Sequence, residues 1–292
     1  MKNEMNVFLT GVNGFVGSHL KKYLEKKYNI LAPSRKDLNL LSEEDVDDFF
    51  KRHNIDVVVH AALVGGSRKE EAAESALNQN LRMFFNIIKN KRRFKKMIHC
   101  GSGAEYDKRF PIVKVKEEDF DKRIPIDEYG LGKYVCSKYI EGIENIVCLR
   151  IFALFGSGED YRYRFISNAI CRNIFGMPIT MNQNVYFDYI YIKDFLRIVE
   201  YFINNKPKHK FYNIGTGKKI DLKSIVAKIN GITDRKSEVV IRRQGLSNEY
   251  TCNNERLLRE IKGFKFTGPD TYTKELYAWY RGNKKFIKKE TI

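Results

Sequence analysis

A phenol and an ammonium group stand four residues apart in the segment Tyr129-Gly130-Leu131-Gly132-Lys133. On a helix these two side chains would lie on one face, within reach of a common point. Ser102 adds a hydroxyl shortly after the apolar run from Phe94 to Cys100, at the carboxyl end of a predicted strand. Ligand-facing groups of parallel sheets usually lie at that end. The position of these residues in the chain, more than the common Tyr-x-x-x-Lys spacing, makes them candidate catalytic residues.

A glycine-rich stretch near the N-terminus supplies a second kind of chemistry, phosphate binding. Thr10-Gly11-Val12-Asn13-Gly14-Phe15-Val16-Gly17 follows the apolar run Val7-Phe8-Leu9 and opens an amphipathic segment that ends near Tyr28. Gly11 can make the tight turn, Gly14 lets a diphosphate approach the backbone, and Gly17 lets helix and strand pack closely. The helix N-terminus then points free N–H groups at an anion. The stretch predicts a dinucleotide site, with Asn13, Phe15 and Val16 beside the glycines.

The elements that must position these residues alternate between strand and helix. Further strands are predicted at Tyr28 to Ala32 and Asp56 to His60, and helices after Ser42, as N-cap, and over Ala76 to Lys89. The nearly continuous β-branched run before His60 is typical of a strand buried on both faces of a parallel sheet. This rhythm predicts an α/β fold, a Rossmann-type doubly wound parallel sheet.

The end of the second predicted strand bears on the choice of cofactor. NAD-binding folds commonly place an acidic residue there to bind the ribose hydroxyls, whereas Ser34 and Arg35 can hold a 2′-phosphate. NADP(H) is therefore favoured, with NAD(H) as the alternative. In that alternative Arg35 is a surface arginine and Asp37 binds the ribose.

The composition limits the other classes of partner. The 292 residues carry a formal net charge of +17, which raises the question of nucleic acid. The basic residues are spread along the chain, however, and no zinc-finger spacing, RNA-recognition signature or basic zipper is present. We predict no nucleic-acid partner, and keep a non-catalytic nucleotide-sensing or RNA-binding protein as the alternative of another class.

Neither a disulfide framework nor a metal site is indicated, because the five cysteines are widely separated and lack a C-x-x-C pair. The first residues lack the apolar core of a signal peptide. No apolar run reaches the roughly 18 residues that a spanning helix needs. We therefore predict no metal, no membrane partner and a cytoplasmic location.

Several motifs together resemble the extended short-chain dehydrogenase/reductase family, which contains nucleotide-sugar epimerases, dehydratases and reductases. The glycine spacing is G-x-x-G-x-x-G, and Ser102 comes four residues before Tyr106 and ahead of Tyr129 and Lys133. The other motifs are His60-Ala61-Ala62, Arg150-Ile151-Phe152, Phe187-Asp188-Tyr189-Ile190-Tyr191-Ile192-Lys193-Asp194 and Tyr212-Asn213-Ile214-Gly215. The resemblance covers nearly the whole chain.

This resemblance implies a role for each candidate. Tyr129 is the proton donor or acceptor at the sugar oxygen, Ser102 hydrogen-bonds the same oxygen, and Lys133 holds the nicotinamide ribose. Outside the glycine loop, the implied cofactor contacts are Ser34, Arg35, Asn39, Leu40, Ala61, Ala62, Asn80, Tyr129, Lys133, Phe152 and Leu154. The predicted substrate contacts are Val64, Gly65, Ser102, Gly103, Ala104, Phe165, Arg172, Arg242 and Arg243. A homodimer through the helix that bears Tyr129 is also implied.

Within the family, Arg35, Asp37 to Leu41 and Ala61 to Gly66 look most like GDP-L-fucose synthase, a bifunctional epimerase and 4-reductase. The cysteine and histidine with which that group epimerises C3 and C5 are replaced here by Ala104 and Phe165, neither of which exchanges a proton with carbon. Dehydratases carry an Asp-Glu pair directly after the serine. Here Gly103 and Ala104 stand in those positions, and Glu105 comes one place late.

What remains is hydride exchange at C4. The predicted reaction is NADPH-dependent reduction of the C4 ketone of a 4-keto-6-deoxy sugar nucleotide, with GDP favoured, in surface-polysaccharide sugar biosynthesis. The alternative is a nucleotide-sugar 4-epimerase that retains NAD.

We predict two domains. A Rossmann domain spans 1–155 with a returning segment at about 187–212, and a substrate-binding domain spans 156–186 and 213–292. Phe187 stands where many family members have an arginine, which shifts the predicted diphosphate contact to Arg172, Arg242 and Arg243. Arg242 and Arg243 follow a predicted strand at Val239 to Ile241 and cannot both face one way on an extended chain, so one is expected to reach the substrate. A final helix is predicted over Asp270 to Tyr280.

Overall fold

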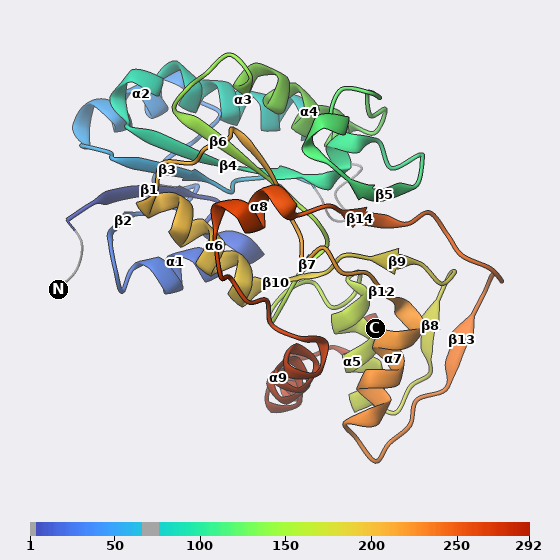
Figure 1. The fold of residues 1–292 in the computed structure, drawn as a ribbon. Helices are drawn as coiled ribbons and strands as arrows, with labels where there is room; N and C mark the ends of the chain where they lie inside the picture. The colour runs from blue at the N-terminus through green and yellow to red at the C-terminus, as the bar shows by residue number, and fades with distance from the viewer. Residues whose placement is uncertain (1–3, 66–75) are drawn as a thin grey trace.

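A parallel six-stranded sheet forms the centre of the fold, in a computed structural model that describes residues 4–65 and 76–292. Its strand order is β11-β6-β4-β3-β1-β2 (Figure 1), and every pairing is parallel. The strands are β1 (Asn6–Thr10), β2 (Asn29–Leu31), β3 (Val57–His60), β4 (Lys96–Ser102), β6 (Ile146–Ile151) and β11 (Phe211–Ile214). The α/β, Rossmann-type prediction is confirmed.

Helices cover both faces of this sheet. Figure 1 shows α2, α3 and α4 on one face and α1 and α6 on the other. Their bounds are α1 (Phe15–Leu24), α2 (Glu43–Arg52), α3 (Ala76–Lys89), α4 (Glu128–Ile140) and α6 (Ile192–Asn204). The predicted N-cap is present, since Ser42 Oγ accepts from the Asp45 N–H at 3.1 Å. Tyr129 and Lys133 lie on α4, as the spacing predicted.

The continuous apolar runs follow from burial on both faces. Val7 and Leu9 of β1 belong to the core under α1 and α6, whereas Phe8 between them packs into the core under α2 and α3. All three are completely buried. A strand that must be apolar on both faces cannot show polar alternation. The continuous apolar pattern therefore indicates that β1 is a central strand of the sheet.

The chain reverses its direction of travel across the sheet at β1. β2 pairs with one edge of β1 and β3 with the other. In open sheets of this kind ligands bind beyond the carboxyl ends of the strands at such a reversal. The glycine stretch follows β1 and the Ala61-Ala62 pair follows β3. Both therefore lie where a ligand is expected.

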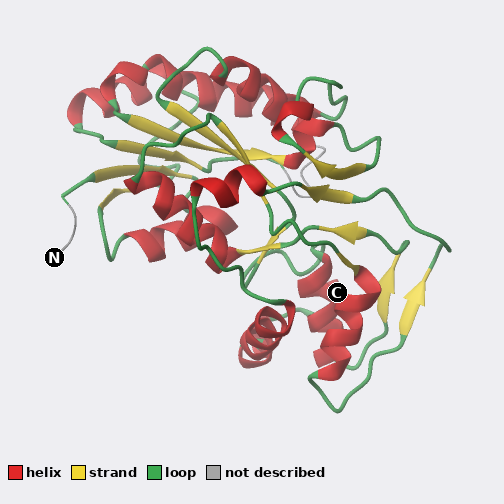
Figure 2. Ribbon diagram, in the orientation of Figure 1, coloured by secondary structure: helices red, strands yellow, loops and turns green. Residues whose placement is uncertain are grey.

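A smaller set of elements lies beyond the carboxyl ends of these strands (Figure 2). A four-stranded sheet has the order β12-β9-β14-β5, with β5 (Ile112–Val115), β9 (Tyr186–Phe187), β12 (Ile220–Asp221) and β14 (Tyr250–Cys252). Two further strand pairs are β7 (Leu154–Phe155) with β10 (Ile190–Tyr191) and β8 (Ile179–Met181) with β13 (Val239–Ile241). The helices are α5 (Phe165–Ile174), α7 (Leu222–Gly231), α8 (Glu255–Glu260) and α9 (Pro269–Gly282).

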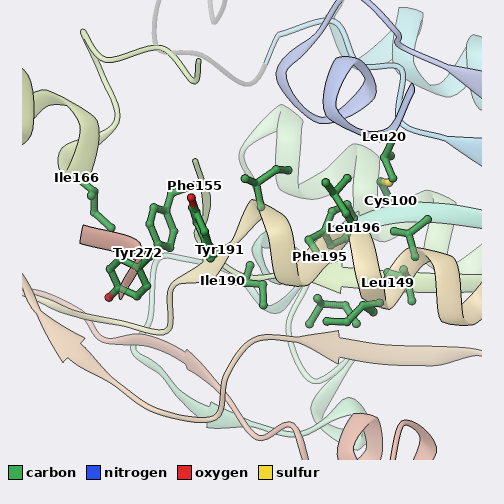
Figure 3. Packing of buried hydrophobic residues seen from close by; sticks show 14 of the residues in the cluster. Leu20, Cys100, Leu149, Phe155, Ile166, Ile190, Tyr191, Phe195, Leu196 and Tyr272 are labelled. Atoms are coloured by element: carbon green, nitrogen blue, oxygen red, sulfur yellow. The ribbon is translucent and has the colours of Figure 1, made fainter. Parts of the chain in front are cut away.

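One hydrophobic core runs from the central sheet into this second set. Leu20, Leu149 and Phe195 lie at one end and Phe155 and Tyr272 at the other (Figure 3). The set of elements that belongs to or packs on the central sheet differs in two places from the predicted first domain. β11 extends the returning segment to Ile214, and α8 packs on β11, although it comes from the predicted substrate-binding part. In the described ranges no helix has the length and apolar character that a membrane crossing requires.

Candidate active site

The glycine loop has the shape that phosphate binding requires. Gly11 has φ +74°, and a Cβ on it would lie 2.6 Å from the Ala61 carbonyl oxygen. A Cβ on Gly17 would overlap the Gly11 carbonyl. At Gly14, the N-cap of α1, the nearest atom to such a Cβ is 3.3 Å away, no side chain caps the helix, and its first turn holds no acid. The open N-terminus of α1 therefore fits a dinucleotide's diphosphate.

Hydrogen bonds tie the ends of β1 and β3 together beside this loop. Thr10 Oγ1 accepts from the Ala61 and Ala62 N–H groups at 3.2 and 3.1 Å. Asn80, predicted as a cofactor contact, is bonded to the backbone of Val64: it accepts the Val64 N–H at 2.8 Å and donates to its carbonyl at 2.7 Å. Asn80 thus positions the chain after β3. Gly65 follows within the described chain, and Gly66 lies outside it.

The strand end that selects the cofactor is preorganised by Asp37. Ser34 donates to Asp37 Oδ2 from its backbone N–H at 3.0 Å and from its hydroxyl at 2.6 Å. The Ser34 hydroxyl lowers the pKa of Asp37, so this carboxylate is ionised and already bonded. Arg35 is exposed. Among the nearby candidates, Asn39 accepts the Leu41 N–H at 3.1 Å, and the Leu40 carbonyl accepts from Asn86 at 2.9 Å.

Tyr129, Lys133 and Ser102 converge at the carboxyl end of β4. Asp127 caps α4 by accepting the Gly130 N–H at 2.9 Å, which starts the helix one residue before Tyr129. Lys133 Nζ donates to the Cys100 carbonyl at 2.6 Å and so reaches β4 two residues before Ser102. Burial alone would lower the pKa of Lys133, but its electrostatic interactions with Tyr129, Cys136, Cys100 and Glu105 outweigh burial and raise that pKa. Lys133 is therefore a permanent cation beside Tyr129.

Ser102 ends β4 and caps the short 3-10 turn Gly103–Tyr106. Its Oγ accepts the Ala104 N–H at 3.1 Å, and its side chain is only 4% exposed. Glu105 closes the turn, because its carboxylate accepts the Ser102 N–H at 2.9 Å. The same carboxylate accepts the Arg150 Nε–H at 2.7 Å. Both charged groups are buried in the core. Glu105 is therefore held in the core by Arg150 and by the backbone of the turn.

A cavity of 20 Å³ opens beside Tyr129 and Lys133. His60 and His99 line it with their rings stacked 5.5 Å apart. Burial lowers the pKa of His60 to about 3 and that of His99 well below its ordinary value. Both imidazoles are therefore neutral near pH 7 and add no positive charge next to Lys133.

Two side chains near the catalytic candidates had no sequence signal. Tyr250, from β14, lies against the Ser102 turn, because a Cβ placed on Gly103 would lie 2.5 Å from its hydroxyl oxygen. Lys108 Nζ lies 5.7 Å from the centre of the Tyr129 ring and 3.5 Å from Asp127. Neither belongs to a motif. Tyr250 reaches the site only because β14 pairs with β5 and β9, which come from distant parts of the chain.

The predicted substrate contacts have different surroundings. Gly103 and Ala104 follow Ser102 directly, and Phe165 begins α5. Arg172 donates to the Pro178 carbonyl at 3.0 Å, within the second set of elements. Arg242 and Arg243 are exposed and follow β13, which Figure 1 shows at the outer edge of this set.

The two remaining cofactor candidates lie where the chain passes from β6 into the second set of elements. Phe152 is fully buried, with its ring 4.9 Å from that of Tyr250, and Leu154 begins β7.

A larger cavity of 290 Å³ lies away from these residues, between α8 and the segment around Glu117. Its charged groups pair with one another, for example Arg256 with Glu118 and Arg259 with Glu255. None of the predicted site residues lines it. Among the residues that the structure describes, no group of three or more side chains is arranged to hold a metal ion.

The sequence model of the NAD dependent epimerase/dehydratase family matches residues 7–215, which contain the glycine loop and all three catalytic candidates. The chain belongs to this family. A GDP-L-colitose synthase of Yersinia pseudotuberculosis is 22% identical in an alignment of 276 positions, and the alignment covers 84% of this chain and 90% of that protein. The family assignment makes the chain an enzyme of the epimerase/dehydratase group.

Solved structures of family members share the fold closely. A GDP-mannoheptose C4 reductase of Campylobacter jejuni with NADP bound superposes with a TM-score of 0.81 at 18% identity, covering 96% of this chain and 99% of its own. A UDP-glucose 4-epimerase of Thermotoga maritima with UDP-glucose gives the same TM-score at 21% identity, with coverage of 96% and 99%. Because a reductase and an epimerase fit equally well, the fold does not decide between these two reactions.

Proposed function

We propose that this protein reduces the C4 ketone of a 4-keto-6-deoxy sugar nucleotide with NADPH, with GDP as the favoured nucleotide. The observation that carries the proposal is the meeting of Ser102, Tyr129 and Lys133 at the carboxyl end of β4, beside the open glycine loop. Tyr129 supplies a proton to the ketone oxygen, Ser102 donates a hydrogen bond to the same oxygen, and Lys133 places a positive charge beside Tyr129. This set offers nothing positioned to attack carbon.

The residues divide the work as follows. When bound, NADPH supplies the hydride that adds to C4. Tyr129 gives its hydroxyl proton to the ketone oxygen, which becomes the C4 hydroxyl, and Ser102 donates a hydrogen bond to the same oxygen as negative charge develops there. Lys133, held by the Cys100 carbonyl, stabilises the phenolate that Tyr129 becomes. Protonation of Tyr129 from water then restores the starting state.

The preference for NADPH rests on Ser34, Arg35 and Asp37. An adenosine ribose with two free hydroxyls is usually bound by a carboxylate at this position. Here that carboxylate is bonded to Ser34, and the exposed Arg35 can meet a 2′-phosphate. The relative with NADP bound supports the same choice.

Two other reactions of the family lack their acid or base here. Ala104 is buried and carries no titratable group, and Phe165 is apolar. Glu105, the acid nearest to Ser102 in the chain, is paired with Arg150 in the core. Reduction at C4 needs only Tyr129 as a proton source, which this site has.

The test is NADPH consumption by the purified protein against a panel of GDP-, CDP- and dTDP-linked 4-keto-6-deoxy sugars, with NADH in parallel. Rapid consumption with one nucleotide, and NADPH preferred over NADH, is the expected result. If no sugar of the panel is reduced and the protein is isolated with NAD bound, the reductase proposal is wrong. The 4-epimerase, which the Thermotoga maritima relative exemplifies, would then take its place.

A further inference from the structure

One carboxylate joins three elements beside the catalytic candidates. Glu105 Oε1 accepts the Ser102 N–H at 2.9 Å, at the end of β4. Its other oxygen, Oε2, accepts the Ser137 hydroxyl of α4 at 2.6 Å and the Arg150 Nε–H of β6 at 2.7 Å. Glu105 and Ser137 are completely buried, and Arg150 is 1% exposed. Water therefore cannot replace any of these bonds unless the core opens.

Ser137 lies on the face of α4 that carries the catalytic candidates. It comes four residues after Lys133 and eight after Tyr129, and side chains at this spacing share one face of a helix. Lys133 donates to a backbone carbonyl of β4 at 2.6 Å. This face of α4 is therefore joined to β4 directly through Lys133 and also through the Glu105 carboxylate. Of these two links, only the second includes the backbone of Ser102.

The bonding pattern around Glu105 suits an ionised carboxylate. The groups that donate to it are the Ser102 N–H, the Ser137 hydroxyl and the Arg150 guanidinium. An ionised carboxylate has only acceptor positions, whereas an amide would place an NH2 group against one of these donors. The guanidinium packs 4.0 Å from the centre of the Phe120 ring, and its positive charge offsets the cost of burying the carboxylate.

We propose that Glu105 is a positioning residue that fixes the Ser102 turn relative to the face of α4 that carries Tyr129. The inference rests on the proposed function for the oxygen on which Ser102 and Tyr129 act. Its physical basis is that two groups acting on one atom must keep a fixed separation, because a misplacement of about 1 Å can cost about 10²-fold in rate. The acid that stands one place late for a dehydratase thus has a use in a reductase.

A purely structural role is the competing explanation, since Glu105 also belongs to a buried ion pair with Arg150. Ser137→Ala separates the two roles, because it removes the link to α4 and leaves both the ion pair and the bond to Ser102 in place. We expect kcat to fall about 5- to 10-fold, while KM for the sugar nucleotide and the affinity for NADPH stay within about twofold. A structural role alone would lower the urea midpoint of unfolding and leave kcat unchanged.

Ser167→Ala is the matched control. Ser167 is also completely buried, and its hydroxyl donates to another buried carboxylate, that of Glu159, in the second set of elements. This variant should lower the urea midpoint about as much as Ser137→Ala and leave kcat unchanged. Glu105→Gln should lower kcat further, about 30-fold, but it also leaves the buried Arg150 unpaired. Ser137→Ala keeps that pair and therefore carries the test.

The Ser102→Ala background tests whether the link acts through the Ser102 hydroxyl. Alanine keeps the backbone N–H that Glu105 binds and removes only the hydroxyl. In this background Ser137→Ala should lower kcat less than about twofold, because the group that the link positions is gone. An unchanged kcat when Ser137→Ala is made in the wild type, or the full loss in the Ser102→Ala background, would overturn the inference.

Hydrogen exchange of the Ser102 turn gives a substrate-free readout, which keeps this inference separate from the proposed function. Exchange is measured by mass spectrometry for a peptide that includes residues 102–106 in the wild type, Ser137→Ala and Ser167→Ala. Ser137→Ala should speed exchange there about fivefold, and the control should not change it. Equal rates in all three proteins would contradict the link between the turn and α4. If the wild type reduces no sugar of the panel, the proposed function fails, and these rates still decide whether Glu105 joins the turn to α4.

Discussion

The two sides of the candidate site differ in what holds their side chains. On the side of β4 and α4, each group is fixed by neighbours in the chain: Ser102 by Ala104 and Glu105, and the start of α4 by Asp127. On the side of the second set of elements, Tyr250 is placed by strand pairing with Ile112 and Phe187. Contacts between residues close in the chain produce a recognisable residue spacing in the sequence. Pairing of strands from distant segments produces no such spacing, so the second side is harder to predict from sequence.

Removing the proton donor of the first side should have the largest effect. We expect Tyr129→Phe to lower kcat about 10³-fold, or about 4 kcal/mol in activation free energy, with NADPH affinity retained. Steady-state kinetics and fluorescence titration of NADPH measure the two quantities. Tyr139→Phe, an exposed tyrosine on the same helix, is the control. Full turnover by Tyr129→Phe would show that the motif-bearing side does not carry the chemistry.

The second set of elements contains a buried acid, Glu159, which no sequence motif marks. Glu159 is 4% exposed, and burial raises its pKa to about 8, although a hydrogen bond from Ser167 opposes this. The carboxyl thus keeps its proton in the folded state to about pH 8 and loses it near the ordinary value of 4.5 when unfolded. Its stability contribution is complete below about pH 4.5 and is lost as pH rises toward 8.

Glu159→Gln should remove this pH dependence. The full shift corresponds to about 5 kcal/mol, and local opening of the site limits the measured loss to about 3 kcal/mol. Urea unfolding at pH 5, 7 and 9 should show the wild type losing stability relative to the variant. Parallel curves would mean that Glu159 is hydrated.

His60 on the other side has the opposite sign, because burial lowers its pKa to about 3. Its contribution is present above pH 6.5 and is lost as pH falls toward 3.

Local patterns predicted much of the first side. The helix predicted over Ala76 to Lys89 agrees with the described part of α3 and with its end at Lys89, and the positive φ of Gly11 follows from its place in the loop. The sequence did not reveal the ion pair of Glu105 with Arg150, because each side chain is an ordinary surface type until the fold buries it. Asn80 was predicted as a cofactor contact from the resemblance, but its bonds to Val64 had no sequence signal. Sequence spacing specified which backbone turns form, whereas side-chain partners depended on tertiary packing.

Cofactor selection is a local property and should respond to one residue. We expect Arg35→Ala to raise KM for NADPH roughly 10- to 30-fold, or about 1.4 to 2 kcal/mol, because a charge-assisted bond to the 2′-phosphate is lost. KM for NADH should change less than about threefold. Arg92→Ala, an exposed arginine beyond α3, controls for net charge. Equal changes in KM for NADPH and NADH would contradict the 2′-phosphate contact and favour the alternative in which Asp37 binds the ribose.

Arg242 and Arg243 test the less predictable side with the smallest effect. Both are exposed, and their N–H groups donate to the Met181 and Asn182 carbonyls at 3.1 and 2.8 Å, in a bend directly after β13. We expect one of the two side chains to contact the diphosphate. Its alanine substitution should raise KM for the sugar nucleotide about three- to fivefold, or about 1 kcal/mol, and the other substitution less than about twofold. Each variant is the other's control for the loss of one charge. Equal effects would mean that the pair acts only through the long-range field of the basic surface, and raising the salt concentration would then abolish both, whereas a contact with the diphosphate would persist.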